Sequence, residues 1–248
     1  MKLNSNSIKI AVMTDAHGNL LALKQVINDI EIEGCTNIYH LGDSIAIGPY
    51  PKETLDLLLQ NNVVMLMGNH EHYYVSDEDK LKTFIPEHEL KHQLWVKSEL
   101  GTKYIDVIKD LPYILKEKFN GMEVLLQHYP LDSNIRDNNS FKPICKDQSP
   151  NNLTDLFKDS TEKLVFYGHH HPYHDCIVNV SGRRFINPGS LGCSHDNFAR
   201  YCIAEFFSEG YNITFKKVEY NKQSIVNDMK NSNIPEKEFI CKVFYGIE

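Results

Sequence analysis

The fold is decided first by residues 8–19, which read Ile-Lys-Ile-Ala-Val-Met-Thr-Asp-Ala-His-Gly-Asn. Apolar side chains alternate through the first half of this stretch, and a period of two predicts a β-strand over 7–13. From Leu20 to Ile32 the apolar residues recur at helical spacing, which predicts an amphipathic helix that ends at Gly34. A strand, a polar turn and a helix in this order form the first unit of an α/β fold.

The same unit continues along the chain. A second strand is expected over 37–41, a helix over 52–60 behind Pro51, and a third strand over 63–67. Each strand runs into a polar turn, Gly42-Asp43 after the second and Gly68-Asn69 after the third. Strands that alternate with helices pair in parallel through right-handed crossovers.

The second half of the chain is read mainly as hairpins. Residues 77–110 predict a helical insert in two or three segments, broken at Pro86 and Gly101, with Trp95 packing it onto the body. Beyond it we expect hairpins over 113–127, 177–186 and 201–218, a short helix over 153–158, a strand over 163–167, and helices over 222–229 and 235–243. This order predicts one α/β domain over 1–248, with a two-sheet core covered by helices on both outer faces.

Composition limits the function. The formal net charge of −7 argues against non-specific nucleic-acid binding, which depends on Lys and Arg. The six cysteines form no CxxC pair, so a zinc knuckle is not expected and free buried thiols are. The N-terminus lacks a signal-peptide pattern and no apolar run is long enough to span a bilayer, so we expect a cytoplasmic protein.

Five polar clusters each follow a predicted strand. In an α/β sheet such turns meet beyond the carboxyl ends of the strands, where ligands bind. Mixed imidazole and carboxylate donors suit manganese, iron or zinc, and two metal ions can share one carboxylate, for which Asp43 has the central position. The candidate metal ligands are Asp15, His17, Asp43, Asn69, His128, His169 and His171.

Taken together, these motifs resemble those of the calcineurin-like metallophosphoesterases, and the chain as a whole resembles their small bacterial phosphoesterase branch. The resemblance runs from residue 8 to about 206 and includes the stretches 41–51 and 187–190. It implies a four-layer α/β/β/α sandwich of two mixed sheets and a hydroxide activated by two metal ions. It also implies that Asp15, His17 and His171 hold one metal, that Asn69, His128 and His169 hold the other, and that Asp43 bridges them.

The resemblance also assigns catalytic roles. His70 would contact the phosphate and protonate the leaving group, and Asp43 would help orient the hydroxide. Asn69, His70 and Arg136 are the candidate substrate contacts, although an exposed, solvated Arg136 is the simpler reading. One departure stands out, because Tyr129-Pro130 follows His128 where many members have glycine, which would reshape the second metal's edge or the substrate mouth.

Several residues near the motifs have structural readings. Glu71 could fix His70 or cap a helix, and residues 187–190 could form a tight turn that supports the site. His170 should point away from the ligands, and His40 should be a packed core histidine. No metal role is expected for the remaining histidines, His72, His88, His92, His174 and His195.

The expected activity is hydrolysis of a phosphate ester, with a phosphodiester favoured over a phosphomonoester. The monoesterase alternatives include a protein serine/threonine phosphatase and a dinucleoside polyphosphate hydrolase. A non-catalytic scaffold of the same fold is the alternative from another class. The insert and the polar loop 129–152 would determine which substrate the protein selects.

Overall fold

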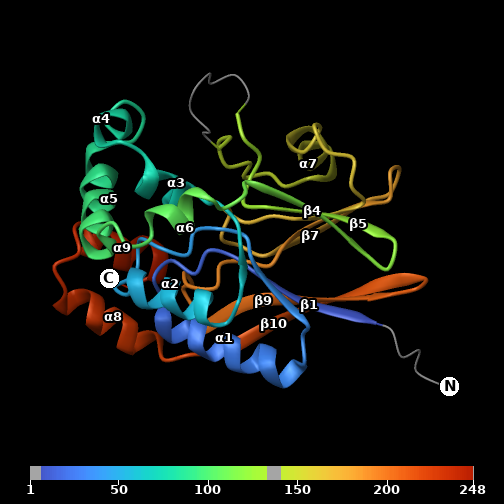
Figure 1. The fold of residues 1–248 in the computed structure, drawn as a ribbon, viewed down its shortest axis with the longest axis horizontal. Helices are drawn as coiled ribbons and strands as arrows, with labels where there is room; N and C mark the ends of the chain where they lie inside the picture. The colour runs from blue at the N-terminus through green and yellow to red at the C-terminus, as the bar shows by residue number, and fades with distance from the viewer. Residues whose placement is uncertain (1–6, 133–140, 248) are drawn as a thin grey trace.

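The computed structural model describes residues 7–132 and 141–247, and Arg136 lies outside them. The chain forms two five-stranded sheets (Figure 1). In the first sheet β1 pairs in parallel with β2, β2 pairs in parallel with β3, and β9 and β10 extend the other edge in antiparallel fashion. The strands of this sheet, in spatial order, are β10 (Gly210–Glu219), β9 (Phe198–Phe207), β1 (Ile8–Met13), β2 (Asn37–His40) and β3 (Val64–Met65).

The second sheet is also mixed. Its centre is parallel, through β5, β6 and β8, and each edge is an antiparallel hairpin partner. The β4–β5 hairpin turns at Asn120-Gly121, where both residues have positive φ, as the sequence predicts. The strands, in spatial order, are β4 (Ile114–Phe119), β5 (Met122–Gln127), β6 (Leu164–Phe166), β8 (Arg183–Asn187) and β7 (His174–Val178).

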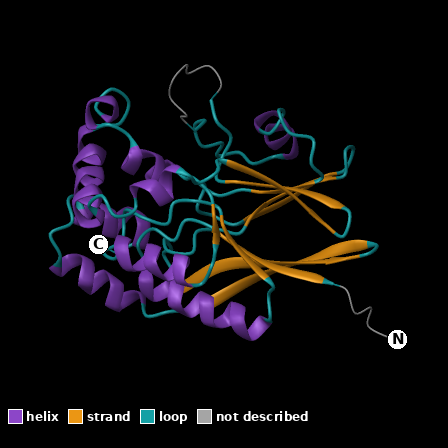
Figure 2. Cartoon of the chain, viewed as in Figure 1, coloured by secondary structure: helices purple, strands orange, loops and turns teal. Residues whose placement is uncertain are grey.

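The two sheets face each other and enclose an apolar core (Figure 2). Ile10 and Val12 of β1 point into this core, whereas the alternate residues Ala11 and Met13 face the helices outside. The outer face of the first sheet is covered by α1 (Leu20–Glu33), α2 (Pro51–Gln60) and α8 (Lys222–Asn231). The outer face of the second sheet is covered by α7 (Pro150–Leu156). The predicted four-layer sandwich is therefore confirmed, with one short helix in its fourth layer.

The remaining helices gather at one end of the two sheets (Figure 1). They are α3 (Asn69–Val75), α4 (Glu78–Leu81), α5 (Glu87–Leu100), α6 (Ile105–Lys109) and α9 (Lys237–Tyr245). The main insert helix, α5, begins after Pro86 and ends at Gly101, the two positions at which the sequence predicts breaks. Trp95 is buried in the core that joins α5 to the body, as expected.

The third strand is shorter than predicted, because only Val64 and Met65 form ladder pairs, with β2. The next residues are extended but change partners. The N–H of Leu66 still donates to the carbonyl of His40, whereas that of Met67 donates to the carbonyl of Pro112. The chain therefore leaves the first sheet shortly before it reaches Asn69. In the described part of the chain no helix is both long and apolar enough to cross a membrane.

Candidate metal centre

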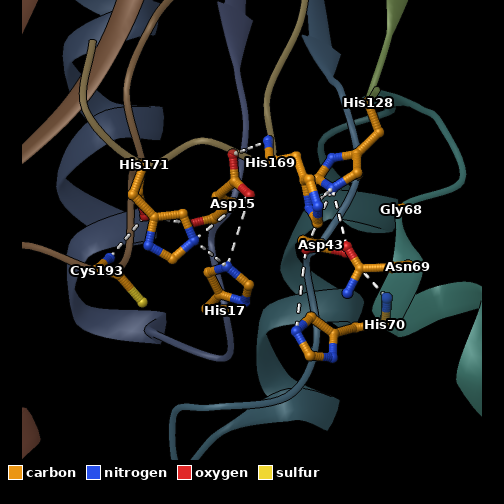
Figure 3. A network of polar contacts seen from close by, with 12 residues as sticks. Asp15, His17, Asp43, Gly68, Asn69, His70, His128, His169, His171 and Cys193 are labelled. Atoms are coloured by element: carbon orange, nitrogen blue, oxygen red, sulfur yellow. Dashed lines mark hydrogen bonds and ion pairs between the residues drawn. The ribbon is translucent and has the colours of Figure 1, made fainter. Parts of the chain in front are cut away.

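All seven predicted metal donors lie together at the carboxyl ends of the strands (Figure 3). They come from the turns after five strands of both sheets. Asp15 and His17 follow β1, Asp43 follows β2, Asn69 follows β3, His128 follows β5, and His169 and His171 follow β6. Segments far apart in the sequence therefore meet in one site, as the strand-end pattern predicts.

The first donor group is formed by Asp15, His17 and His171. The Nε2 atoms of the two histidines lie 3.0 Å apart. Oδ1 of Asp15 lies 3.6 Å from Nε2 of His17 and 3.8 Å from Nε2 of His171. The other oxygen, Oδ2, accepts a hydrogen bond from the N–H of His169, which leaves Oδ1 turned toward the two rings.

The second donor group surrounds Nε2 of His128. This atom lies 3.2 Å from Oδ1 of Asn69 and 3.3 Å from Nδ1 of His169. It also lies 3.2 Å from Oδ2 of Asp43. Asp43 belongs to both halves of the site, because its carboxylate also falls within one cluster of possible ligand atoms with His17 and His70.

The backbone at four of these positions is held in the left-handed region. The φ angles are 54° at Asp15, 47° at His17, 58° at Asp43 and 66° at His169. Such conformations cost about 1–3 kcal/mol each in a non-glycine residue and persist where neighbouring structure fixes them. Here the N–H of Asp15 donates to the backbone carbonyl of Gly42, and the N–H of His17 donates to the backbone carbonyl of Asp43, at 3.0 Å each. The strained backbone conformations therefore occur at residues whose side chains offer donor atoms.

Two glycines of the motifs are needed because a side chain at either position would collide with a neighbouring turn. Neither Gly68 nor Gly168 has a positive φ, so neither position requires glycine for its backbone conformation. A Cβ on Gly68 would lie 2.3 Å from the backbone nitrogen of Asp43, and one on Gly168 would lie 2.1 Å from Oγ1 of Thr14. These glycines let neighbouring turns approach closely enough for the donor atoms to meet. Gly42, with φ of 117°, does need glycine for its conformation.

Electrostatics keep the carboxylates ionised. Burial raises the pKa of Asp43, but the adjacent His128 and His70 outweigh it and bring the pKa well below its usual value. Burial also raises the pKa of Asp15, and its contact with His17 and the charge of His128 reverse the shift. Burial would lower the pKa of His128, but the charge of Asp43 raises it to about 9. The protonated, positively charged form of His128 is therefore favoured beside the carboxylate of Asp43.

The donor set fits metal ions. Oδ1 of Asp15 is fully buried and has no hydrogen-bond partner within the described residues. The paired imidazole nitrogens, 3.0 Å apart in one group and 3.3 Å apart in the other, lie close enough together for each pair to bind one cation. Burial lowers the pKa of His169 and of His171 to about 4, so both rings are neutral at pH 7, the form that binds metals. Nitrogen and oxygen donors of this kind suit manganese, iron and zinc alike.

His70 lies at the edge of the site, 4.0 Å from Asp43 between Nε2 and Oδ2. Its backbone N–H donates to Oδ1 of Asp43 at 3.0 Å, so the ring and the carboxylate are positioned together. The ring is fixed by Gln93 of α5, whose Nε2 lies 2.7 Å from Nδ1 of His70. No local pattern in the sequence indicates this role of Gln93, because it lies 23 residues from His70 on the insert.

The carboxylate of Glu71 forms its hydrogen bonds with residues other than His70, so the prediction that it fixes the His70 ring is wrong. Its carboxylate accepts the backbone N–H groups of Asp43 and Ser44, each at 2.7 Å, and the N–H of Gly68 at 3.1 Å. The bond from the N–H of Gly68 caps the N-terminus of α3, which agrees with the alternative prediction that Glu71 caps a helix. The first two bonds fasten the turn that carries Asp43, a role that the sequence analysis missed.

The remaining neighbours line or support the site. Tyr129 is buried with its ring 5.0 Å from that of His169, so it forms part of the edge beside the second donor group. Ser190 donates through Oγ to the carbonyl of Asp15, which confirms the supporting role of 187–190. Cys193 is buried, as expected, but its Sγ also clusters with ring nitrogens of His17 and His171.

Two of the other histidines accept hydrogen bonds from backbone N–H groups. His40 is fully buried and its Nδ1 accepts the N–H of Gly42. His92 accepts the N–H of Ile47 at 2.8 Å. His170 is not one of the clustered ligands, but it lines the cleft over the site together with its two neighbours.

The chain is similar to several known proteins. A family model described as "Calcineurin-like phosphoesterase superfamily domain" matches residues 8–209. The protein MJ0912 of Methanocaldococcus jannaschii, named as uncharacterized, is 29% identical over 242 residues, which cover 92% of this chain and 94% of that protein.

Two solved structures share the fold. The hypothetical protein PH1004 of Pyrococcus horikoshii has a TM-score of 0.79 at 23% identity, over 97% of this chain and 99% of that one. A metallophosphoesterase from Sphaerobacter thermophilus has a TM-score of 0.73 at 20% identity, over 97% of this chain and 100% of that one.

Proposed function

Because the chain belongs to the calcineurin-like phosphoesterase superfamily, we propose that it hydrolyses a phosphodiester with the help of two metal ions. The observation that carries this proposal is the position of Asp43. Its carboxylate lies 3.2 Å from His128 in one donor group and also clusters with His17 of the other. A single carboxylate shared by two groups of nitrogen and oxygen donors is the arrangement that a two-metal site requires.

The proposed ligands divide as the two groups do. Asp15, His17 and His171 would hold one ion, Asn69, His128 and His169 the other, and Asp43 would contact both. When bound, such ions supply an activated water and neutralise the charge of the phosphoryl oxygens. Manganese or iron is favoured, and zinc fits the same donors. The six free cysteines are in keeping with a reducing cytoplasm as the proposed location.

His70 is proposed to supply the proton to the leaving oxygen. Burial lowers its pKa to about 3, so the ring is neutral at pH 7. The amide of Gln93 contacts Nδ1, so Nε2, the nitrogen on the side of Asp43, is the one that faces the leaving oxygen. The negative charge of a bound phosphate beside Nε2 would raise the pKa of His70, and the imidazolium so formed can give its proton to the leaving oxygen as the ester bond breaks.

A substrate comparison tests the proposal. Protein freed of metal by a chelator is reloaded separately with manganese, iron or zinc, and its hydrolysis of bis-p-nitrophenyl phosphate and p-nitrophenyl phosphate is measured. We expect metal-dependent turnover with the diester as the better substrate. Turnover of the monoester alone would favour a phosphomonoesterase. Folded protein that binds no metal and hydrolyses neither ester would contradict the enzyme proposal and favour a scaffold.

A further inference from the structure

A second cavity of about 230 Å³ adjoins the cleft over the metal centre. The two share Ile47, His70 and Phe244, so a molecule bound at the centre can extend past His70 into this cavity. The cavity lies between α5 of the insert and α9 near the C-terminus, which are neighbours in Figure 1. Helix α9 lies beyond residues 8–209, the part that the family model matches.

The walls of the cavity are largely apolar and aromatic. Phe239, Ile240 and Phe244 line it from α9. Phe239 is 49% exposed, an unusual state for a large aromatic side chain, and its ring centroid lies 6.1 Å from that of His88 across the gap. The ring centroid of Phe244 lies 5.6 Å from that of His171, so this side chain lies where the cavity meets the cleft over the metal donors. Such walls suit a flat ring system.

The polar lining is acidic or neutral. Glu89 and Glu236 bring carboxylates to the cavity, and among its described lining residues there is no lysine or arginine. A leaving group that carried its own phosphate would meet two carboxylates and no counter-charge. The cavity therefore disfavours polyphosphate substrates, in contrast to the metal cleft beside it.

The same lining offers hydrogen-bond acceptors. Glu89 and Glu236 line the cavity, and their carboxylate oxygens accept hydrogen bonds. Glu89 is partly buried, and desolvation raises the pKa of its carboxyl. Acceptors beside apolar walls suit a ring that carries N–H donors, as nucleobases do.

We propose that this cavity binds the leaving group of the substrate, and that this group carries an uncharged aromatic ring with N–H donors, such as a nucleobase. The inference rests on the proposed function, because it places the leaving oxygen at His70. At about 230 Å³ the cavity is below the roughly 300–1,000 Å³ of pockets that hold drug-sized ligands, so it takes one ring system and not a second nucleotide.

Equilibrium binding of adenosine to the metal-loaded protein tests the cavity without turnover. We expect Phe239→Ala to weaken binding about fivefold, because it removes one aromatic wall. Val243→Ala is the matched control, since Val243 is an exposed apolar residue of the same helix and does not line the cavity. Ribose serves as a second probe and should bind far more weakly than adenosine. Equal affinity of the Phe239→Ala and Val243→Ala variants would overturn the inference.

Measurements of turnover provide a second test of the cavity. We expect Glu89→Gln to lower kcat/KM for a dinucleoside monophosphate, whose leaving group carries a nucleobase, more than Glu87→Gln does, because Glu87 is exposed on the same helix and pairs with Lys91. Diadenosine tetraphosphate, whose leaving group is phosphorylated, should be the poorer substrate; a higher kcat/KM for it would overturn the inference. Absence of turnover with adenosine binding intact would contradict the proposed function alone. Diester turnover with both cavity variants unchanged would contradict the cavity assignment alone.

Discussion

The carboxylate of Glu71 accepts the backbone N–H of Asp43 at 2.7 Å, and this bond joins the start of α3 to the turn after β2. The same carboxylate accepts the N–H groups of Ser44 and Gly68 and the hydroxyl of Ser44, at 2.6 to 3.1 Å. Glu71 is fully buried, so no water can replace these bonds. It therefore holds the strained Asp43 in position from outside the donor set.

Replacing Glu71 by Gln should destabilise the protein by about 1–3 kcal/mol, because one acceptor oxygen becomes an NH₂ group that faces buried N–H donors. The misplaced turn should also weaken metal binding. Chemical unfolding and metal content after dialysis measure the two effects. The surface variant Glu87→Gln is the control, and a Glu71→Gln protein with the stability and metal content of wild type would refute this role.

Gly168→Ala should be among the most damaging small substitutions in the chain. The added Cβ would lie 2.1 Å from Oγ1 of Thr14, in the fully packed contact between the two sheets' turns. We expect a loss of about 3 kcal/mol or more, which thermal unfolding would detect. Gly182→Ala is the control, since Gly182 has open space around it and a φ of 67°. That control should lose only about 1 kcal/mol, and similar losses in the two variants would argue against the packing account.

Gln93→Leu should lower kcat about tenfold while metal content stays unchanged, because His70 would lose the group that orients its ring. The loss should be greater for diphenyl phosphate than for bis-p-nitrophenyl phosphate, since phenoxide is the poorer leaving group and depends more on the proton. Steady-state kinetics on both esters measures the difference. An equal loss on both esters would indicate a purely structural role for Gln93.

His40 should make the metal-free protein less stable in acid. Burial lowers its pKa to about 3, whereas the unfolded chain protonates it near pH 6.5. Below pH 6.5 the unfolded state therefore binds more protons, and stability falls as the pH falls from 6.5 toward 3. Between pH 6.5 and 5 the loss is on the order of 2 kcal/mol.

Unfolding of the chelator-treated protein at several pH values checks this prediction. His40→Asn keeps an acceptor for the N–H of Gly42 but removes the titrating ring, so its stability should depend less on pH over this range. His88→Asn, at an exposed position, should leave the dependence as in wild type. If the His40→Asn and wild-type curves are parallel, His40 is not the source.

The donor residues could be predicted because each follows a strand directly in the sequence. Asp15, Asp43 and His128 are placed by local patterns, and the parallel strands bring their turns to one end. The partners of these residues could not be predicted in the same way. Gln93 reaches His70 from the insert, and the ring of Tyr129 reaches His169 across 40 residues, through packing that leaves no periodic signal.

The glycines show a second limit of the sequence. A glycine beside a motif indicates that a side chain is excluded, but not whether conformation or space excludes it. At Gly42 the reason is a positive φ, whereas at Gly68 the neighbouring turn leaves no room. The cavity between α5 and α9 was likewise not foreseen, because it depends on how two distant helices pack.

The central claim is that Asp43 serves both halves of a two-metal site. The most direct measurement is the metal content of purified Asp43→Asn beside wild type, together with turnover of bis-p-nitrophenyl phosphate in the same samples. We predict about two ions per wild-type chain, fewer in the variant, and turnover reduced at least a hundredfold because charge compensation and ligand geometry are both lost. Full metal content and full turnover in a folded Asp43→Asn protein would contradict the account.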